Sequence, residues 1–430
     1  MSVMTTTELT RLIRDQKRED LFLDVYGTLD PQQFAITRIV RLISSCSFSP
    51  SHLFSAPGRT ELGGNHTDHN LGKVLCAAVQ KDTLAAASKR DDGIVVVNSE
   101  GFDSKFSVHT NDLDPKGDEQ GTTHALIRGV LAGIEASGGV VGGFNASVTS
   151  DVAIGSGLSS SASFEVLIGT ILNGLYNDFS ISPEQIARIS QHAENVYFGK
   201  PCGLMDQTAS AVGGIIKIDF KNPDDLQITK LGFNLDYTDY RMVVVNSGSD
   251  HIDLTPAYAS IPAEMRQVAR ELDGNELRET SESAFLEKMQ AIRSKLGDRP
   301  VLRALHFYSE NDRVDRMETA LGDDDFPGFL SAVQASGASS QNILQNAIPP
   351  QSNGHQQGLG FALGLSQIFF EKKGRGIARV HGGGFAGTIQ AYIHKDDFEE
   401  YESFIGSIIG KDVISELVFR HSGACLLLKL

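Results

Sequence analysis

The sequence predicts an α/β chain of the α+β kind with two domains, and three features predict it. Its 430 residues exceed what one small hydrophobic core requires, so two domains are expected. Short runs rich in β-branched residues occur beside longer segments of helical periodicity, which favours a mixture of sheets and helices. After about Phe233 the character of the chain changes, and long charged helical segments follow. We expect an N-terminal domain over residues 1–235 and a C-terminal domain over residues 236–430.

The expected elements of the first domain follow from local patterns. Apolar residues at helical spacing predict helices within residues 1–50, and short apolar runs separated by Gly, Asp and Lys predict strands within residues 72–110. A helix is expected over 122–137, and the segment GGFNASVTSD after it is predicted to form a strand. A further helix is expected to begin at the N-cap Ser182 and to stop at Gly199.

The second domain is expected to combine long helices with short strands. YRMVVVN predicts a strand, and charged segments between roughly residues 263 and 344 predict helices. Near the end, GIARVHGGGFAGTIQAYI and GACLLLKL return to short β-like runs.

Charge and composition exclude several classes of partner. The net charge of -16 disfavours nucleic acid, because a phosphate backbone requires a basic footprint. The first residues are polar, and no run approaches the roughly 20 apolar residues of a membrane span. The four cysteines are scattered without a C-x-x-C pair, which favours reduced thiols over disulfides or a zinc site. We expect a cytoplasmic protein with no membrane partner.

The segment GSGLSSSAS at Gly155–Ser163 is the strongest candidate for a phosphate-binding loop. Glycines let the backbone approach a phosphate, and the N-terminus of the apolar helix that follows contributes partial positive charge. An isolated G-x-G is most often only a turn, but three serines leading into a helix are more specific. The segment is neither a Walker A loop nor a Rossmann fingerprint.

A second segment, SAPGRTELGGNHTDHNLG at 55–72, is polar and punctuated by glycines, which is typical of a binding loop. Two interpretations compete for its side chains. His66, Asp68 and His69 could bind a metal ion, although H-x-D-H is not a standard ligand spacing. The same polar groups would hydrogen-bond the hydroxyls of a polyol.

Two further segments become informative only together with the phosphate loop. Alone, Glu194 is expected on a solvated helix face, Asp206 in a turn, and RVHGGGFAGT at 379–388 in a tight loop. Phosphoryl transfer requires two carboxylates in addition to a phosphate loop. One binds Mg²⁺ and the other lies beside the acceptor hydroxyl.

These segments, in this order, resemble the GHMP kinase superfamily and specifically its galactokinase branch. GRTELGGNHTDHN resembles the galactokinase signature, GSGLSSSAS the superfamily phosphate loop, PCGLMDQ the catalytic segment and HGGGFAG the third motif. RALHFYSENDRV at 303–314 also resembles a family helix. The resemblance implies an N-terminal ribosomal S5 domain 2-like domain, a C-terminal ferredoxin-like domain and an active site in the cleft between them. It implies transfer of phosphate from Mg·ATP to the C1 hydroxyl of a sugar.

The resemblance also implies roles for individual residues. The catalytic positions are Arg59 and Asp206. The Mg²⁺ ligands are Ser161, with Ser160 as a possible helper, and Glu194. The ATP phosphates would be held by Gly155, Ser156, Gly157, Leu158, Ser159 and Ser160. The sugar would be bound by Asn65, His66, Asp68, Gly203 and Tyr258.

Several positions depart from the family pattern. Asn65 replaces the glutamate that contacts the sugar O6, His69 replaces a tyrosine, and Glu61 replaces an asparagine. The family's Ser-His dipeptide is represented by Ser336-Gly337. Loss of a carboxylate near O6 would weaken the repulsion of an anionic C6 group, so galacturonate, or another galactose-like sugar, is an alternative substrate to galactose. A non-catalytic sugar sensor is the alternative of another class. The expected partners are a sugar and ATP, and the expected state is a monomer or small homo-oligomer.

Overall fold

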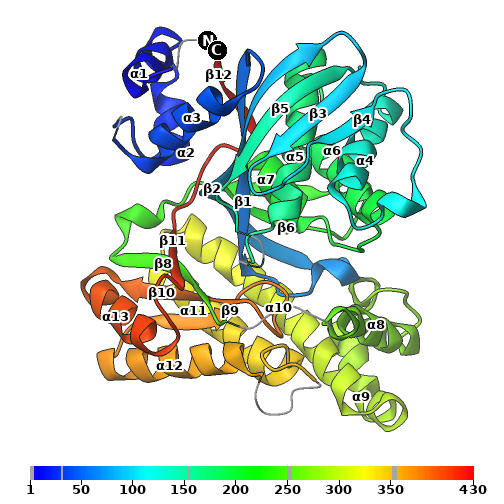
Figure 1. The fold of residues 1–430 in the computed structure, drawn as a ribbon. Helices are drawn as coiled ribbons and strands as arrows, with labels where there is room; N and C mark the ends of the chain where they lie inside the picture. Colours follow the sequence, from blue (N-terminus) through cyan, green and yellow to red (C-terminus); the bar gives the residue numbers. More distant parts are fainter. Residues whose placement is uncertain (1–3, 31, 154, 156, 249–253, 351–355) are drawn as a thin grey trace.

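The computed structural model describes residues 4–30, 32–153, 155, 157–248, 254–350 and 356–430, and they form two lobes (Figure 1). The upper lobe in that view is built on an eight-stranded sheet of order β12-β1-β2-β5-β3-β4, in which β2 also pairs with β6 and β6 with β7. Its strands are β1 (His52–Gly63), β2 (Lys73–Arg90), β3 (Ile94–Ser99), β4 (Phe106–His109), β5 (Gly143–Ser150), β6 (Ile215–Asp219), β7 (Gln227–Leu231) and β12 (Cys425–Lys429).

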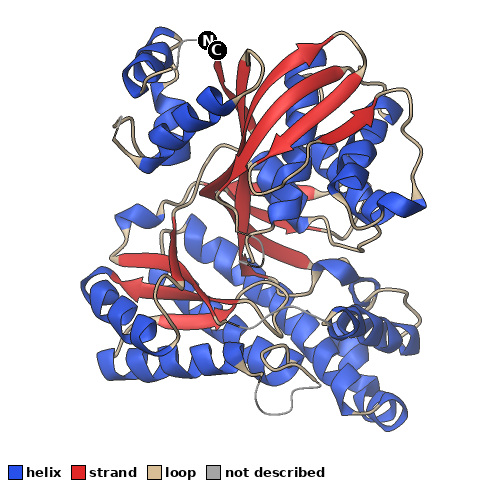
Figure 2. Cartoon of the chain, in the orientation of Figure 1, coloured by secondary structure: helices blue, strands red, loops and turns tan. Residues whose placement is uncertain are grey.

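The lower lobe holds a four-stranded antiparallel sheet of order β11-β8-β10-β9. Its strands are β8 (Tyr240–Asn246), β9 (Ile377–Val380), β10 (Thr388–His394) and β11 (Ile414–Leu417). The mixed α/β class and the two-domain organisation expected from the sequence agree with these two sheets and their helices (Figure 2).

Helices cover both sheets. Those of the upper lobe are α1 (Thr6–Asp15), α2 (Glu19–Tyr26), α3 (Phe34–Ser45), α4 (Thr123–Ala136), α5 (Ser160–Tyr176), α6 (Pro183–His192) and α7 (Met205–Val212). Those of the lower lobe are α8 (Thr255–Glu271), α9 (Glu282–Leu296), α10 (Asp298–Gly322), α11 (Phe326–Ser339), α12 (Gly358–Lys373) and α13 (Phe398–Ile408). Two π-helical turns are η3 (Ala193–Phe198) and η6 (Ser340–Leu344), and the short 3₁₀ turns are η1 (Asp68–Asn70), η2 (Gly117–Glu119), η4 (Leu235–Tyr237), η5 (Leu277–Glu279) and η7 (Lys395–Asp397).

The helix predicted after Ser182 begins as expected but changes type before it ends. The Ser182 hydroxyl accepts a hydrogen bond from the backbone N–H of Gln185. From Ala193 the backbone continues as η3 and stops at Gly199, whose φ of 84° lies in the left-handed region. π-helical turns often occur at functional sites, and this one carries Glu194.

A hydrophobic cluster joins the two lobes. Leu62 and Leu75 of the first sheet pack with Val314 and Met317 of α10 in one buried cluster. The approach is close, since a Cβ atom at Gly63 would lie 2.4 Å from the Met317 sulfur. Burial of about 25 cal/mol per Å² of apolar surface makes such a cluster the main attraction between lobes. It holds β1, which carries the signature residues, against the lower lobe.

The last strand of the chain lies in a different sheet from the one that the expected domain ranges imply. β12 pairs antiparallel with β1, with His52 opposite Lys429, so the end of the range 236–430 belongs to the first sheet. Its Leu427 and Leu428 are buried against α1–α3. The strand thereby covers the edge of β1 that would otherwise leave backbone groups unpaired. Lys429 of this strand also exchanges two hydrogen bonds with the Gln16 side chain just after α1, so β12 lies beside the end of that helix.

All four cysteines are free thiols, as the sequence predicts. Among the helices that the structure describes, we find none with the length and apolar character needed to cross a lipid bilayer.

Candidate active site

The predicted phosphate loop follows β5 and leads into α5. Gly155 and Gly157 have φ values of 77° and 73°, and Ser159 has a φ of 63°, so the loop turns sharply before the helix begins. Ser156 lies outside the described residues. The first N–H groups of α5 have no partner within the helix, and this end of the helix attracts anions.

Arg59 fixes the other side of this loop from the middle of β1. Its backbone N–H donates to the carbonyl of Leu158 at 3.0 Å, and its guanidinium donates to the carbonyl of Gly157. In a trans peptide the carbonyl and the next N–H point in opposite directions. The N–H groups of Leu158 and Ser159 therefore point away from Arg59, toward the side where phosphate groups can bind.

Asp206 lies in the first turn of α7 between Arg59 and Ser159. The Arg59 Nε donates to one carboxylate oxygen at 2.6 Å, and the Ser159 hydroxyl donates to the other at 2.7 Å. Burial raises the pKa of Asp206, but the Arg59 charge and the hydrogen bonds from Arg59 and Ser159 outweigh it, so the pKa lies below its usual value. The carboxylate is therefore ionised at neutral pH.

Glu194 lies on η3 with its carboxylate facing the start of α5. Its Oε1 accepts from the Ser161 hydroxyl at 3.0 Å and from the Lys200 ammonium at 2.9 Å. Its Oε2 accepts from the Gln207 side chain at 2.8 Å. Only 4% of the Glu194 side chain is exposed, contrary to the solvated helix face that the residue would occupy if it had no role.

The signature segment brings Asp68 against the catalytic segment. A Cβ atom at Gly203 would lie 1.9 Å from an Asp68 carboxylate oxygen, so only glycine fits there. His66 has a φ of 59°, and its Nε2 lies 2.8 Å from the carbonyl of Gly383 in the third motif. Burial lowers the pKa of His66 to about 4, so the imidazole is neutral. The Gly383 carbonyl can only accept, so Nε2 carries the proton.

Asn65 is held by protein groups on both sides of its amide. Its nitrogen donates to Glu61 at 3.1 Å and to the carbonyl of Gly382 at 2.7 Å. Its oxygen accepts from Asn346 at 2.7 Å and from Ser340 at 3.2 Å. The residue is 1% exposed. Asn65 thus joins the signature segment to the lower lobe, and its role as a sugar ligand stays a prediction.

Tyr258 and the phosphate loop meet the third motif from opposite sides. The Tyr258 hydroxyl donates to the carbonyl of Gly384, and its ring packs edge-on against Phe385. A Cβ atom at Gly157 would lie 2.7 Å from a nitrogen of His381. The glycine-rich segment 379–388 therefore contacts both Tyr258 and the predicted phosphate loop.

Some residues at the site were not predicted from the sequence. Gln207 and Lys200 contact Glu194, and Arg379 donates to Glu61 at 2.5 Å and to the carbonyl of Leu62. Lys200 and Gln207 flank the catalytic segment, so their position beside PCGLMD is the signal that could have identified them.

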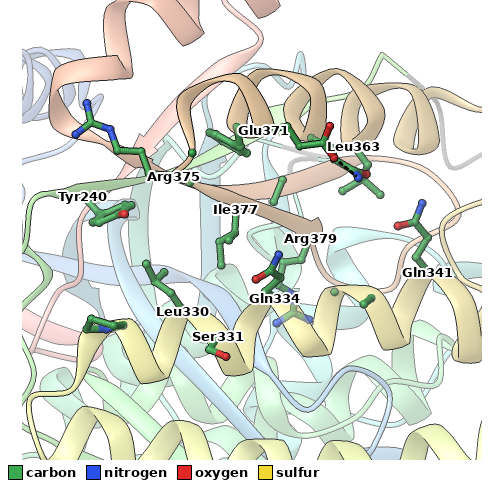
Figure 3. A pocket seen from close by; sticks show the side chains of 18 of the residues that line it. Tyr240, Leu330, Ser331, Gln334, Gln341, Leu363, Glu371, Arg375, Ile377 and Arg379 are labelled. Carbon is green, nitrogen blue, oxygen red and sulfur yellow. Dashed lines mark hydrogen bonds between the residues drawn. The ribbon is translucent and has the colours of Figure 1, made fainter.

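A cavity of about 710 Å³ lies between α11, α12 and β9 in the lower lobe, and Arg379 is among the residues that line it (Figure 3). None of the candidate residues that the structure describes lines it. Within the described part of the chain, no cluster of three His, Cys, Asp or Glu side chains is arranged to hold a metal ion.

Two family models match parts of this chain. The model of the GHMP kinases N terminal domain matches residues 125–214, and that of the galactokinase galactose-binding signature matches residues 45–89. A galactokinase of Streptomyces coelicolor is 32% identical over 342 residues, covering 79% of this chain and 84% of the relative. A galactokinase of Actinobacillus pleuropneumoniae is 30% identical over 402 residues, covering 92% of this chain and 98% of the relative.

Solved structures share the fold. Lactococcus lactis galactokinase, in complex with galactose, has a TM-score of 0.73 at 24% identity and covers 97% of this chain and 100% of its own. Methanococcus jannaschii mevalonate kinase has a TM-score of 0.60 at 14% identity and covers 86% of this chain and 98% of its own.

The two-lobed fold, with a phosphate loop at the start of α5 facing the glycine-rich third motif, is that of the GHMP kinases. Within them, this chain belongs to the galactokinase family. It is a sugar kinase, which transfers a phosphoryl group to an alcohol acceptor and uses ATP as the donor.

Proposed function

We propose that this protein phosphorylates the C1 hydroxyl of galactose with Mg·ATP. One observation carries the proposal: Asp206 is hydrogen-bonded at one oxygen to Arg59 and at the other to Ser159 of the phosphate loop. The carboxylate that would face the acceptor hydroxyl is thereby tied to the loop that would hold the donor phosphates. Phosphoryl transfer depends mainly on such positioning and on electrostatic stabilisation.

Arg59 stabilises the negative charge that develops on the transferring phosphoryl group, because its guanidinium is fixed by Asp206 and by the carbonyl of Gly157. Asp206 orients the acceptor hydroxyl as a charged hydrogen-bond acceptor. A pKa below the usual range makes it a weak base, so the pKa supports an electrostatic partner over a base that removes the proton early.

The residues near Glu194 fit a magnesium ion. A carboxylate and a hydroxyl oxygen lie 3.0 Å apart at the start of α5, and Mg²⁺ prefers such oxygen ligands together with phosphates and water. Ser161 and Glu194 would hold the ion, with Gln207 keeping the carboxylate in place. When bound, the ion would neutralise charge on the ATP phosphates. The backbone from Gly155 to Ser160 would hold those phosphates.

The sugar would be bound on the side of the site opposite the phosphate loop. There Asp68 contacts Gly203 of the catalytic segment, and His66 and Tyr258 contact the third motif. Asp68 next to Gly203 supplies acceptor oxygens, and His66 and Tyr258 supply groups for hydroxyls. We assign Asn65 to holding this segment, because its amide is already bonded on both sides.

Galactose is favoured over galacturonate by the position of Glu61. The negative charge that Asn65 lacks is supplied by Glu61, whose carboxylate lies 3.1 Å from the Asn65 amide and pairs with Arg379. The region near Asn65 therefore keeps a carboxylate, and because Arg379 is already paired with it, this cation offers no free charge to an anionic C6 group.

The test is ADP release measured with a panel of sugars that includes galactose, galacturonate and glucose. We expect turnover with galactose and little with galacturonate. Turnover with galacturonate but not with galactose would show that galacturonate is the substrate instead. Sugar binding without ADP release would instead indicate a sensor.

The proposal extends to the compartment and the assembly. A cytoplasmic enzyme, monomeric or a small homo-oligomer, is supported by the free thiols and by the placement of the site within one chain. Fractionation and light scattering would test both.

A further inference from the structure

Lys200 is a cation next to Glu194 at the solvent side of the site, and the proposed reaction gives it no role. It follows Gly199, the left-handed residue that ends η3. Its Nζ lies 2.9 Å from Glu194 Oε1, yet 61% of its side chain is exposed while 4% of the Glu194 side chain is. The ammonium therefore approaches a buried carboxylate from the solvent side.

The oxygen that Lys200 contacts is the one that faces the start of α5. Oε1 also accepts from Ser161, whereas Oε2 is occupied by Gln207 on the inner side. A buried carboxylate is costly without a partner charge, and Lys200 supplies that charge here. A metal ion bound by Ser161 and Glu194 would require the same oxygen, and two cations would repel each other there.

The phosphate loop itself carries no basic residue, since Gly155–Ser163 reads GSGLSSSAS. Arg59 is buried behind the loop and bonded to Asp206, Gly157 and Leu158. The loop residues themselves therefore supply no side-chain cation to a nucleotide. Lysine suits this place because its ammonium is a point charge on a flexible four-carbon stem.

We propose that Lys200 is a phosphate-binding residue that neutralises Glu194 in the nucleotide-free protein and moves to the nucleotide phosphates when a metal ion occupies Glu194. This inference rests on the ATP half of the proposed function and not on the identity of the sugar. Lys200 thereby exchanges one anion for another, and the site avoids an unpaired buried carboxylate before the metal ion arrives.

The alternative is that Lys200 only forms a surface ion pair. Exposed ion pairs contribute little to stability, with a median of about 0–1 kcal/mol. In that case its removal would change ADP binding equally with and without metal. Exchange instead makes the effect depend on metal, because metal binding in the native protein must displace the lysine.

The experiment is calorimetric binding of ADP, once in EDTA and once in saturating Mn²⁺, for the full chain and the variants Lys200→Met and Lys200→Arg. We expect Lys200→Met to weaken ADP binding in Mn²⁺ by about 5- to 20-fold, the loss of one charge-assisted contact. In EDTA, where Lys200 stays on Glu194, the ADP dissociation constant should change by less than about 3-fold. Lys200→Arg should keep most of the affinity measured in Mn²⁺.

The matched control is Lys288→Met, which removes an exposed lysine that is also paired with a carboxylate, Asp273, but lies on α9 away from the site. It should leave both constants unchanged. An ADP affinity in Mn²⁺ that falls in Lys200→Met no more than the affinity in EDTA does would overturn the exchange. A native protein that binds ADP but phosphorylates no sugar would contradict the proposed function and leave the role of Lys200 intact, whereas absence of ADP binding would contradict both.

Discussion

The Nε atom of Arg59 lies 2.6 Å from a carboxylate oxygen of Asp206, and this contact joins the middle of β1 to the first turn of α7. Residues 147 positions apart are thereby held as one unit beside the phosphate loop. The Arg59 guanidinium also donates to the carbonyl of Gly157, and its backbone N–H donates to that of Leu158. A single residue therefore sets the distance between the Asp206 carboxylate and the predicted phosphate loop.

Arg59→Lys should therefore abolish most of the activity although it keeps the charge. Lysine cannot bridge a carboxylate and a loop carbonyl with one rigid planar group. We expect kcat to fall by about 100- to 1,000-fold, as when an electrostatic donor is removed. Steady-state kinetics measure this, with the thermal unfolding temperature as the control for folding. A kcat within 3-fold of the native value would show that the fork geometry of Arg59 is not required.

Gly203→Ala should weaken sugar binding through Asp68. The new Cβ would lie 1.9 Å from an Asp68 oxygen, so this carboxylate must move. We expect KM for galactose to rise at least about 10-fold while KM for ATP changes little, since a misplaced polar contact costs about 1–3 kcal/mol. Gly232→Ala is the matched control, because its Cβ would meet open space. Equal KM values for galactose in the two variants would show that Asp68 does not bind the sugar.

Asn65→Glu should destabilise the protein, and Glu61→Asn should rescue it. The single change places a second carboxylate beside Glu61 and against the carbonyl of Gly382, in a region that is almost fully buried. We expect a loss of about 2–4 kcal/mol in unfolding free energy, the usual cost of an unpaired buried charge.

The double variant restores one carboxylate and one amide to the pair, so a double-mutant cycle on urea unfolding should show favourable coupling. Additive effects would mean that the two side chains do not interact. The same double variant should raise the preference for galactose over galacturonate, measured by ADP release.

Acid should destabilise the protein partly through His381. Burial, reinforced by the charges of Arg59 and Arg379, lowers the pKa of His381 to about 3. As the pH falls below about 6.5, His381 becomes protonated in the unfolded chain but stays neutral in the folded protein. The free energy of unfolding therefore decreases until the pH reaches the folded pKa. Between pH 7.5 and 5 the loss should be about 2 kcal/mol of unfolding free energy from this group.

His381→Gln should reduce the pH dependence of urea unfolding by about that amount, because glutamine cannot be protonated. His421→Gln is the control, since His421 is exposed. An unchanged pH dependence in His381→Gln would show that His381 is not kept neutral by the fold.

Local patterns indicated many helices and strands of the described chain, but they favoured a binding loop over 55–72, where the residues up to Gly63 form the buried strand β1. Ser182 and Gly199 bound their helical segment as expected, because capping depends on neighbours in the sequence. The π-helical turn that aims Glu194 inward was not predicted, since it depends on contacts with Ser161 and Gln207 from other helices.

Long-range pairing explains what the sequence could not provide. β12 pairs with β1 across more than 370 positions, and no local pattern indicates which strand edge it covers. Glu61 and Asn65 read as two separate departures from the family pattern, whereas the structure shows them as hydrogen-bonded partners. The interpretation of Asn65 as a missing charge near the sugar therefore changed once its neighbours were known.

The turnover number of Asp206→Asn with galactose tests the central claim most directly. Asparagine keeps the shape of the side chain but removes the charge that orients the acceptor hydroxyl. We predict that kcat falls by at least about 1,000-fold, while ADP binding measured by calorimetry stays within about 3-fold. A variant that phosphorylates galactose at close to the native rate would contradict the assignment of Asp206, and with it the account of Arg59, Asp206 and Ser159 as the site of phosphoryl transfer.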